Sequence, residues 1–354
     1  MRRIAAIAIG LCVSIGCGRA GFDDLPTRVT LDAAPDANLG LSRPRELVTC
    51  PAVSPSSDGK EALIAWAAYP EGDAVAEVRF VRADFKGTIV LGPTTVGFAG
   101  GSARVAGLFP AGSGYDVFYE NDDELFMARL DSSGRPLEQV SIATAVHQAS
   151  IAPIPSGYLV VWEEIDAGRN VVARPFDSQG VALGPIQELV AAADRPMALQ
   201  TPAGTLVAYG SDTGLAAVVV NEGAGVIDGP LAVGDGGYGR AVSLARDPGT
   251  GNILATYRGN DAEFETRFRF LTVGPLAGAS ALSGFLPLNR GQWARASATV
   301  AADGTFVVVR QSDAFSLLSG MVMHSVSLDS GASDAVQLPV DEEASCPTAI
   351  GLAD

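Results

Sequence analysis

The chain has 354 residues, with 24 Lys and Arg against 40 Asp and Glu, which gives a formal net charge of −16. A strongly negative surface repels nucleic acid and anionic lipid headgroups, so the charge argues against both as partners of the folded chain. The 41 Gly and 21 Pro are dispersed at intervals, and this distribution predicts many tight turns between short strands.

The N-terminus has the layout of a secretory signal. Met1-Arg2-Arg3 is basic, and residues 4–15 form an apolar run that is too short for a transmembrane helix. Gly16 followed by Cys17 resembles the box at which bacterial lipoproteins are cleaved and acylated. We therefore expect a signal peptide over residues 1–16 and acyl chains, palmitate among them, on Cys17. Ordinary cleavage after Ala20, giving a secreted protein, is the alternative.

Residues 17–44 are expected to form a lipidated, disordered, acidic tether, because Asp, Ala, Pro and Leu recur there without a clean period. By resemblance to Gram-negative lipoproteins, Gly18 after the cysteine does not mark retention at the inner membrane. The expected location is therefore the outer membrane, at its periplasmic or cell-surface face, and the lipid is the expected link to the membrane.

Residues 45–354 contain a short pattern that recurs six times at spacings of roughly 45–55 residues, which is typical of β-propeller blades. Each unit has a small or apolar opening, an apolar run that ends in an aromatic residue, and a second apolar run closed by a turn. The openings are Pro51-Ala52-Val53, Arg104-Val105-Ala106, Ser150-Ile151-Ala152, Pro196-Met197-Ala198, Ala241-Val242-Ser243 and Ala296-Ser297-Ala298, and a seventh, Pro347-Thr348-Ala349, stands alone.

The aromatic residue stands at a constant place in five of the six units, as Trp66, Tyr119, Trp162, Tyr209 and Tyr257. The surrounding runs are almost continuously apolar, which indicates strands buried on both faces. We expect the aromatic rings to fill the space between neighbouring blades, in preference to stacking on a sugar.

The third strand of a unit ends in a repeated Asp-to-Gly turn. The turns are Asp84-Phe85-Lys86-Gly87, Asp131-Ser132-Ser133-Gly134, Asp177-Ser178-Gln179-Gly180 and the shorter Asp329-Ser330-Gly331. Asp accepts hydrogen bonds from the backbone ahead of it and Gly supplies a positive φ, so these aspartates are predicted to form turns and not to bind calcium.

The chain resembles the secreted bacterial β-propeller lipoproteins. Residues 157–162 (GYLVVW) and residues 173–180 (ARPFDSQG) carry the resemblance, which extends over about residues 45–350. It implies an all-β propeller fold and an extracellular setting, and it brings no activity or catalytic residue with it.

Six blades are the preferred number. Cys50 and Cys346 stand at the same phase, six units apart, each directly before a proline. If six units complete a circle, the two cysteines meet, and we predict a Cys50–Cys346 disulfide. Seven blades are the alternative, because residues 45–48 look like an outer strand and residues 347–352 like an extra first strand.

Few residues have the character of catalytic or metal-binding groups. His147 and His324 lie in different units without acidic or cysteine neighbours at ligand spacing, which predicts surface or turn positions and no metal site. Glu163 and Glu164 end a strand, where carboxylates are usually solvated. No nucleophile elbow, phosphate loop or dinucleotide fingerprint occurs, so no cofactor is expected.

Three arginines recur at the phase of the cysteines, just before the first strand of units four, five and six. In a propeller the first strand lines the central channel, so Arg195, Arg240 and Arg295 could converge on an anionic ligand such as a carboxylate or acidic glycan. Pairing with the surplus acids around them is the preferred interpretation.

These observations predict a non-enzymatic module at the cell envelope that binds or scaffolds a protein or glycan. An envelope glycosidase or lyase with its active site at the channel mouth is the alternative, and a structural subunit is a third possibility. Propellers host all three, so the fold cannot choose among them.

Overall fold

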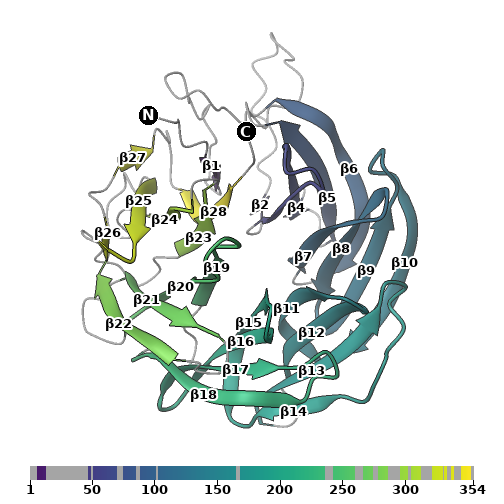
Figure 1. Ribbon diagram of the computed structural model, residues 1–354. Coiled ribbons are helices and arrows are strands. Elements are labelled where there is room, and N and C mark those ends of the chain that lie inside the picture. Colours follow the sequence, from purple (N-terminus) through teal and green to yellow (C-terminus); the bar gives the residue numbers. More distant parts are fainter. Residues whose placement is uncertain are drawn as a thin grey trace.

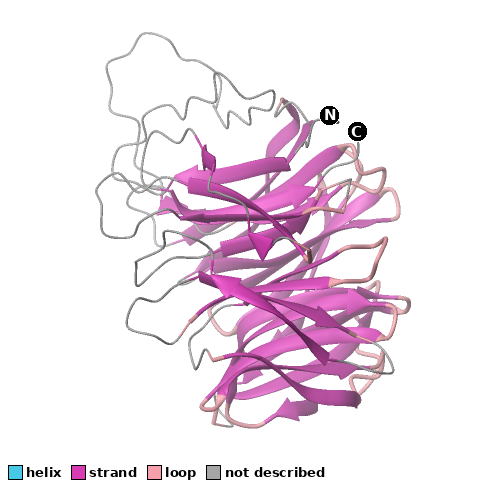
Figure 2. Cartoon of the chain, turned by 60° about the vertical axis from the view of Figure 1, so that its left-hand side comes forward, coloured by secondary structure: helices cyan, strands magenta, loops and turns pink. Residues whose placement is uncertain are grey.

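The computed structural model describes residues 6–12, 47–48, 51–69, 75–84, 88–100, 103–164, 168–235, 242–259, 266–273, 278–285, 296–301, 304–311, 321–329, 331–332, 336–338 and 344–351. Strands account for the regular structure of these residues, and none of them is helical (Figure 2). No helix among them is long and apolar enough to cross a membrane.

The described strands form seven antiparallel sheets, and six of these are blades arranged in a ring (Figure 1). Blade 2 comprises β7 (Ala103–Ala111), β8 (Gly114–Asn121), β9 (Glu124–Leu130) and β10 (Pro136–Thr144). Blade 3 comprises β11 (Val146–Ile154), β12 (Gly157–Glu164), β13 (Asn170–Asp177) and β14 (Gln187–Val190). Blade 4 comprises β15 (Ala193–Thr201), β16 (Gly204–Ser211), β17 (Gly214–Val220) and β18 (Val226–Gly234).

The other three blades follow the same order from the channel outwards. Blade 1 comprises β3 (Ala52–Pro55), β4 (Glu61–Tyr69), β5 (Val75–Asp84) and β6 (Ile89–Gly100). Blade 5 comprises β19 (Val242–Arg246), β20 (Ile253–Arg258), β21 (Thr266–Thr272) and β22 (Gly278–Phe285). Blade 6 comprises β23 (Ala296–Val300), β24 (Phe306–Gln311), β25 (Met321–Ser327), β26 (Gly331–Ala332) and β27 (Val336–Leu338).

The ring closes through one additional strand near the C-terminus. β28 (Ala344–Gly351) lies against β23 of blade 6 and against β3 of blade 1. It therefore occupies the place of an extra first strand, as residues 347–352 suggested. Its hydrogen-bonded partner is β1 (Ala6–Cys12), which belongs to the apolar run of the predicted signal peptide.

The fold is a β-propeller with six blades, as the repeat predicted, of which four have four strands and blades 1 and 6 have five. The interpretation of residues 45–48 as an outer strand is wrong for the described part, because β2 (Leu47–Val48) pairs with β4 and lies on the channel side of that strand. The other five openings are shifted relative to Ser150. Its place in the strand pairing is occupied by Ala52, Gly107, Met197, Ser243 and Ser297, so the true equivalents lie one, three, one, two and one residue later than the repeat suggested.

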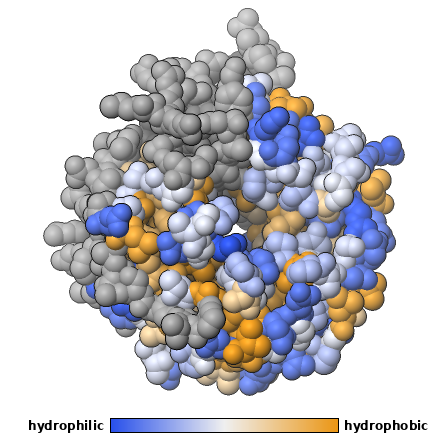
Figure 3. Space-filling view, viewed as in Figure 1, coloured by the Kyte–Doolittle hydropathy of each residue, from blue (hydrophilic) through white to orange (hydrophobic). Residues whose placement is uncertain are grey.

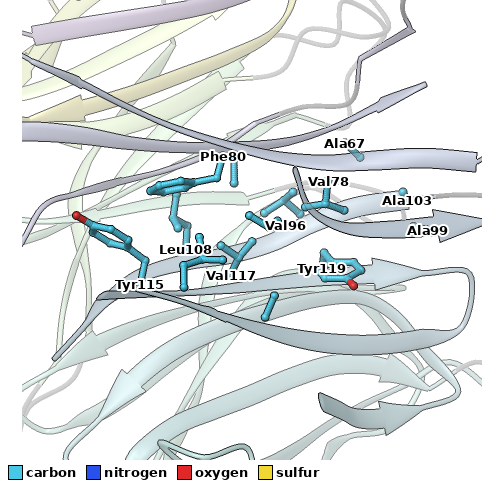
Figure 4. Close-up of a cluster of buried hydrophobic side chains, with 14 of the residues drawn as sticks. Ala67, Val78, Phe80, Val96, Ala99, Ala103, Leu108, Tyr115, Val117 and Tyr119 are labelled. Atoms are coloured by element: carbon cyan, nitrogen blue, oxygen red, sulfur yellow. The ribbon is translucent and has the colours of Figure 1, made fainter. Parts of the chain in front are cut away.

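The recurring aromatic residues are buried, as expected for rings that fill the space between blades. Tyr119 packs in the cluster formed with blade 1, Trp162 in the cluster formed with blade 2, and Tyr209 in the cluster formed with blade 3. Figure 4 shows the first of these interfaces, in which the Phe80 and Tyr115 rings face one another with centroids 5.1 Å apart. These positions exclude sugar stacking on the rings.

The Asp-to-Gly turns have the predicted geometry where they are described. Asp131 Oδ1 accepts hydrogen bonds from the backbone N–H groups of Ser133 and Arg135, and Gly134 has φ +73°. Asp177 makes the same contacts in blade 3. Arg129 of blade 2 also donates to the Ser178 carbonyl in the blade 3 turn, so each turn contributes to the contact between blades.

Candidate functional site at the channel mouth

One end of the ring brings together the starts of the inner strands and the ends of the second strands. We call this end, where β7, β11 and β15 begin and β8, β12 and β16 end, the channel mouth. Cross-strand pairs there join Arg104 to Glu120 in blade 2 and His147 to Glu163 in blade 3. Figure 3 views the ring from the side of the hairpin turns, opposite to the channel mouth, and shows a hollow at the centre with hydrophilic residues beside it.

The inner strands β7, β11 and β15 carry a β-bulge at this end. One extra residue is inserted between His147 and Ser150 in β11, and one between Asp194 and Met197 in β15. Bulges redirect side chains near binding sites. Gln148 and Arg195 occupy equivalent places in the two bulges, and both have left-handed backbone conformations, with φ 53° and 48°.

Of the three recurring arginines that could bind a ligand, Arg195 lies among the described residues. It is half-buried in the bulge of β15, and it forms no ion pair with any residue that the structure describes. Arg240 and Arg295 lie outside the described residues, as do Cys17, Cys50 and the tether. Cys346 belongs to β28, for which the backbone pairing is described.

Glu120 joins blade 2 to blade 3 at the channel mouth. Its buried carboxylate accepts a hydrogen bond from the Ala149 N–H at 2.5 Å and one from Arg104 Nη2 at 2.6 Å. Arg104 also donates to the Ala149 carbonyl. The Arg104–Glu120 ion pair therefore binds both the N–H and the carbonyl of Ala149 in the β11 bulge.

Glu163 stands at the equivalent place in blade 3, with different partners. The carboxylate is buried, at 4% exposure, and Oε2 lies 3.3 Å from Nδ1 of His147. Oε1 lies 3.8 Å from Nε of Arg169, which is mostly exposed. Leu159 and Val161 of the same strand face pack with blade 4, so the alternation of β12 directs Glu163 toward β15.

Three sequence-based expectations about acids and histidines are corrected here. Glu163 is buried and not solvated, His147 has an acidic neighbour across the strand pair, and His324 is fully buried in β25. The missed signal was the hairpin itself: His147 and Glu163 flank the Pro155-Ser156 turn at nearly equal distances. The bulge shifts the pairing by one residue, which the sequence did not show.

The chemistry of this set is polar and of mixed charge. Arg104, Arg169, Arg195 and the half-exposed His147 lie at this end of the ring with three buried carboxylates, those of Glu120, Glu163 and Asp194. Glu120 is already occupied by Ala149 and Arg104. No group of three or more His, Cys, Asp or Glu suited to a metal ion occurs among the described residues. Arg195, which forms no ion pair with the described residues, is available to bind an anion.

The fold and this mouth define the chain as a β-propeller with a polar channel entrance. No protein-family model matches the chain, and no curated protein matches it. Among solved structures, the chain is similar to the SapL1 lectin in complex with alpha methyl fucoside, with a TM-score of 0.51 and 14% identity over 82% of this chain and 97% of that one.

Two further similar structures are putative 6-phosphogluconolactonases. The protein from Bacteroides uniformis has a TM-score of 0.56 and 13% identity over 84% of this chain and 87% of that one. The protein from Bacteroides fragilis has a TM-score of 0.54 and 11% identity over 84% of this chain and 86% of that one. At these identities the likeness concerns the fold alone.

Proposed function

We propose that this protein is a lipid-anchored binding module of the outer membrane, and that its propeller binds an anionic group of a glycan or protein at the channel mouth. The observation that carries the proposal is Arg195, a half-buried arginine without an ion pair among the described residues. A guanidinium group pairs with a carboxylate through two parallel hydrogen bonds, which gives both affinity and orientation.

The surroundings of Arg195 support a ligand carboxylate as its partner. Blade 2 pairs its own arginine, Arg104, with Glu120, whereas the bulge of blade 4 holds Arg195 in a left-handed conformation. With a net charge of −16, the protein as a whole repels anions, so a local cluster of cationic groups is needed to hold one.

The anchoring part of the proposal rests on the sequence. Acylation at Cys17 and a tether of about 20 residues would allow the propeller to move on the order of 25 Å from the membrane. Cys17→Ala should move the protein from the membrane fraction to the soluble fraction of the envelope. Unchanged membrane association of that variant would contradict the lipid anchor.

The binding part is tested with an array of acidic and neutral glycans and small carboxylates. We expect the wild-type propeller to bind acidic members, and Arg195→Ala to lose at least about tenfold in affinity. Arg135→Ala removes an exposed arginine of a turn and serves as the matched control. Equal binding by wild type and Arg195→Ala, or no acidic ligand at all, would refute the proposal.

A lyase is the second candidate, and one observation favours it. A half-exposed His147 beside the buried Glu163 has the arrangement of a general base oriented by a carboxylate. Hydrolysis requires two carboxyl groups flanking the bond, and Glu120 is committed to Ala149. An ultraviolet-absorbing unsaturated product from an acidic polysaccharide, abolished in His147→Ala, would establish this alternative.

A further inference from the structure

Glu120 of blade 2 and Glu163 of blade 3 each face the same bulge position in the next blade. The residue at this position differs between blade 3 and blade 4. Glu120 of blade 2 accepts the N–H of Ala149, which follows Gln148 in the β11 bulge. In β15 the residue after the equivalent Arg195 is Pro196, which has no N–H. Glu163 therefore cannot form the bond between blades that Glu120 forms.

Glu163 is thus buried with few hydrogen-bond donors. The His147 contact at 3.3 Å is long for a charge-assisted hydrogen bond, and the Arg169 contact at 3.8 Å exceeds hydrogen-bond distance. An ionised carboxylate accepts about four hydrogen bonds. A buried carboxylate with this deficit can accept hydrogen bonds from further donors.

The Glu163 carboxylate, which has few donors, faces the β15 bulge that contains Arg195. The alternation of β12 directs Glu163 toward the start of β15. A little further along the two inner strands, β11 is hydrogen-bonded to β15, because Ser150 Oγ accepts the Ala198 N–H at 3.0 Å. An acceptor group and a cation without an ion pair among the described residues therefore lie at one junction between two blades.

We infer that this junction binds a polyhydroxylated acid of the uronic acid class, whose carboxylate pairs with Arg195 while a hydroxyl group donates to Glu163. His147 orients the Glu163 carboxylate and reaches the surface beside it. The inference rests on the proposed function, because it names the ligand class of the same site. It adds that hydroxyl groups contribute to recognition through Glu163.

Three small probes separate the two contributions. Glucuronate carries the acid and the hydroxyl groups, glucose carries hydroxyl groups alone, and cyclohexanecarboxylate carries the acid alone. Binding is measured by ligand-observed NMR titration of the full chain. We expect glucuronate to bind about fivefold or more tightly than either of the other two probes, since each lacks one hydrogen-bonding contribution.

Two substitutions test the role of Glu163, one by removing its carboxylate and one by adding a competing donor. Glu163→Leu removes the acceptor and should reduce glucuronate affinity to that of cyclohexanecarboxylate, whose own affinity stays unchanged. Pro196→Ala leaves Glu163 in place and supplies the missing backbone N–H, which competes with the ligand hydroxyl. It should weaken glucuronate alone while preserving the melting temperature, and Pro153→Ala, at an exposed position of β11, is its control.

The outcomes distinguish the inference from the function on which it rests. If Arg195→Ala weakens both acids but Glu163→Leu and Pro196→Ala leave the preference for glucuronate intact, the inference is wrong and the anion site stands. Equal affinity of the wild type for glucuronate and cyclohexanecarboxylate has the same meaning. If Arg195→Ala changes neither acid, or if neither acid binds, both are wrong.

Discussion

The Glu120 carboxylate of blade 2 accepts a hydrogen bond from the Ala149 N–H of blade 3, with 2.5 Å between Oε1 and N. Arg104 binds the same carboxylate and donates to the Ala149 carbonyl, so one ion pair holds the inner strands of two blades together. Among the described inner strands, Ser150 and Ser243 form simpler links of this kind, each accepting the N–H of an alanine in the next blade.

Replacing Glu120 should therefore destabilise the propeller. Glu120→Leu leaves the Ala149 N–H and the Arg104 guanidinium without their buried acceptor, which should cost about 2 kcal/mol of unfolding free energy. Urea denaturation measures the change, with Glu138→Gln on the exposed outer strand β10 as the control. Equal midpoints for the two variants would show that the link between the blades contributes little.

A glycine on the outer strand makes room for the tyrosine of the next blade. A Cβ on Gly97 of β6 would lie 2.5 Å from the Tyr119 hydroxyl oxygen, and Gly234 of β18 stands in the same relation to Tyr257. Gly97→Ala should cost about 1–3 kcal/mol through overpacking. Gly100→Ala on the same strand, with its nearest neighbours 3.8 Å away, should be much milder.

A double-mutant cycle tests whether the two residues act on one another. Tyr119→Phe removes the atom nearest to the new methyl group, so it should recover part of the loss caused by Gly97→Ala. Strictly additive effects of the two substitutions would mean that the glycine is needed for another reason.

Stability should fall at alkaline pH because several phenols are buried between blades. Burial raises the pKa of Tyr119 from 10.0 to about 12 and also raises the pKa of Tyr257. The folded chain holds these protons after the unfolded chain has lost them. The stabilisation is therefore complete below pH 10 and is lost as the pH rises toward about 12. Urea midpoints across this range should decrease.

Tyr119→Phe is the control for this alkaline effect, because it removes one titrating group without removing the ring. Its unfolding free energy should depend less steeply on pH above 10 than that of the wild type. An identical dependence in both proteins would assign the alkaline loss to other groups.

The disulfide between Cys50 and Cys346 remains a prediction of the repeat. β28, which contains Cys346, lies against β3, which begins at Ala52 just after Cys50, and this neighbourhood supports the pairing. Peptide mapping without reduction should recover the two cysteines as one linked pair. Closing a loop of about 300 residues stabilises by at most on the order of 5 kcal/mol, so reduction should lower the melting temperature. Alkylation of both thiols without a reductant would contradict the pairing.

The sequence by itself was sufficient for the architecture. The fold follows from local patterns that repeat: apolar strands, an aromatic residue at a constant phase and an Asp-to-Gly turn, each of which depends on residues close in the chain. For the same reason Asp131 and Asp177 were correctly assigned to turns, since their hydrogen bonds reach only two and four residues ahead.

Only the tertiary structure decided the chemistry of the channel mouth. The contact of Glu163 with His147 depends on the pairing of two strands whose register a bulge shifts by one residue, and no local pattern marks that bulge. The different roles of Glu120 and Glu163 depend on whether the neighbouring blade offers the N–H of Ala149 or the ring of Pro196. Contacts between blades join residues far apart in the chain, so the burial of a carboxylate and its partners is determined by packing.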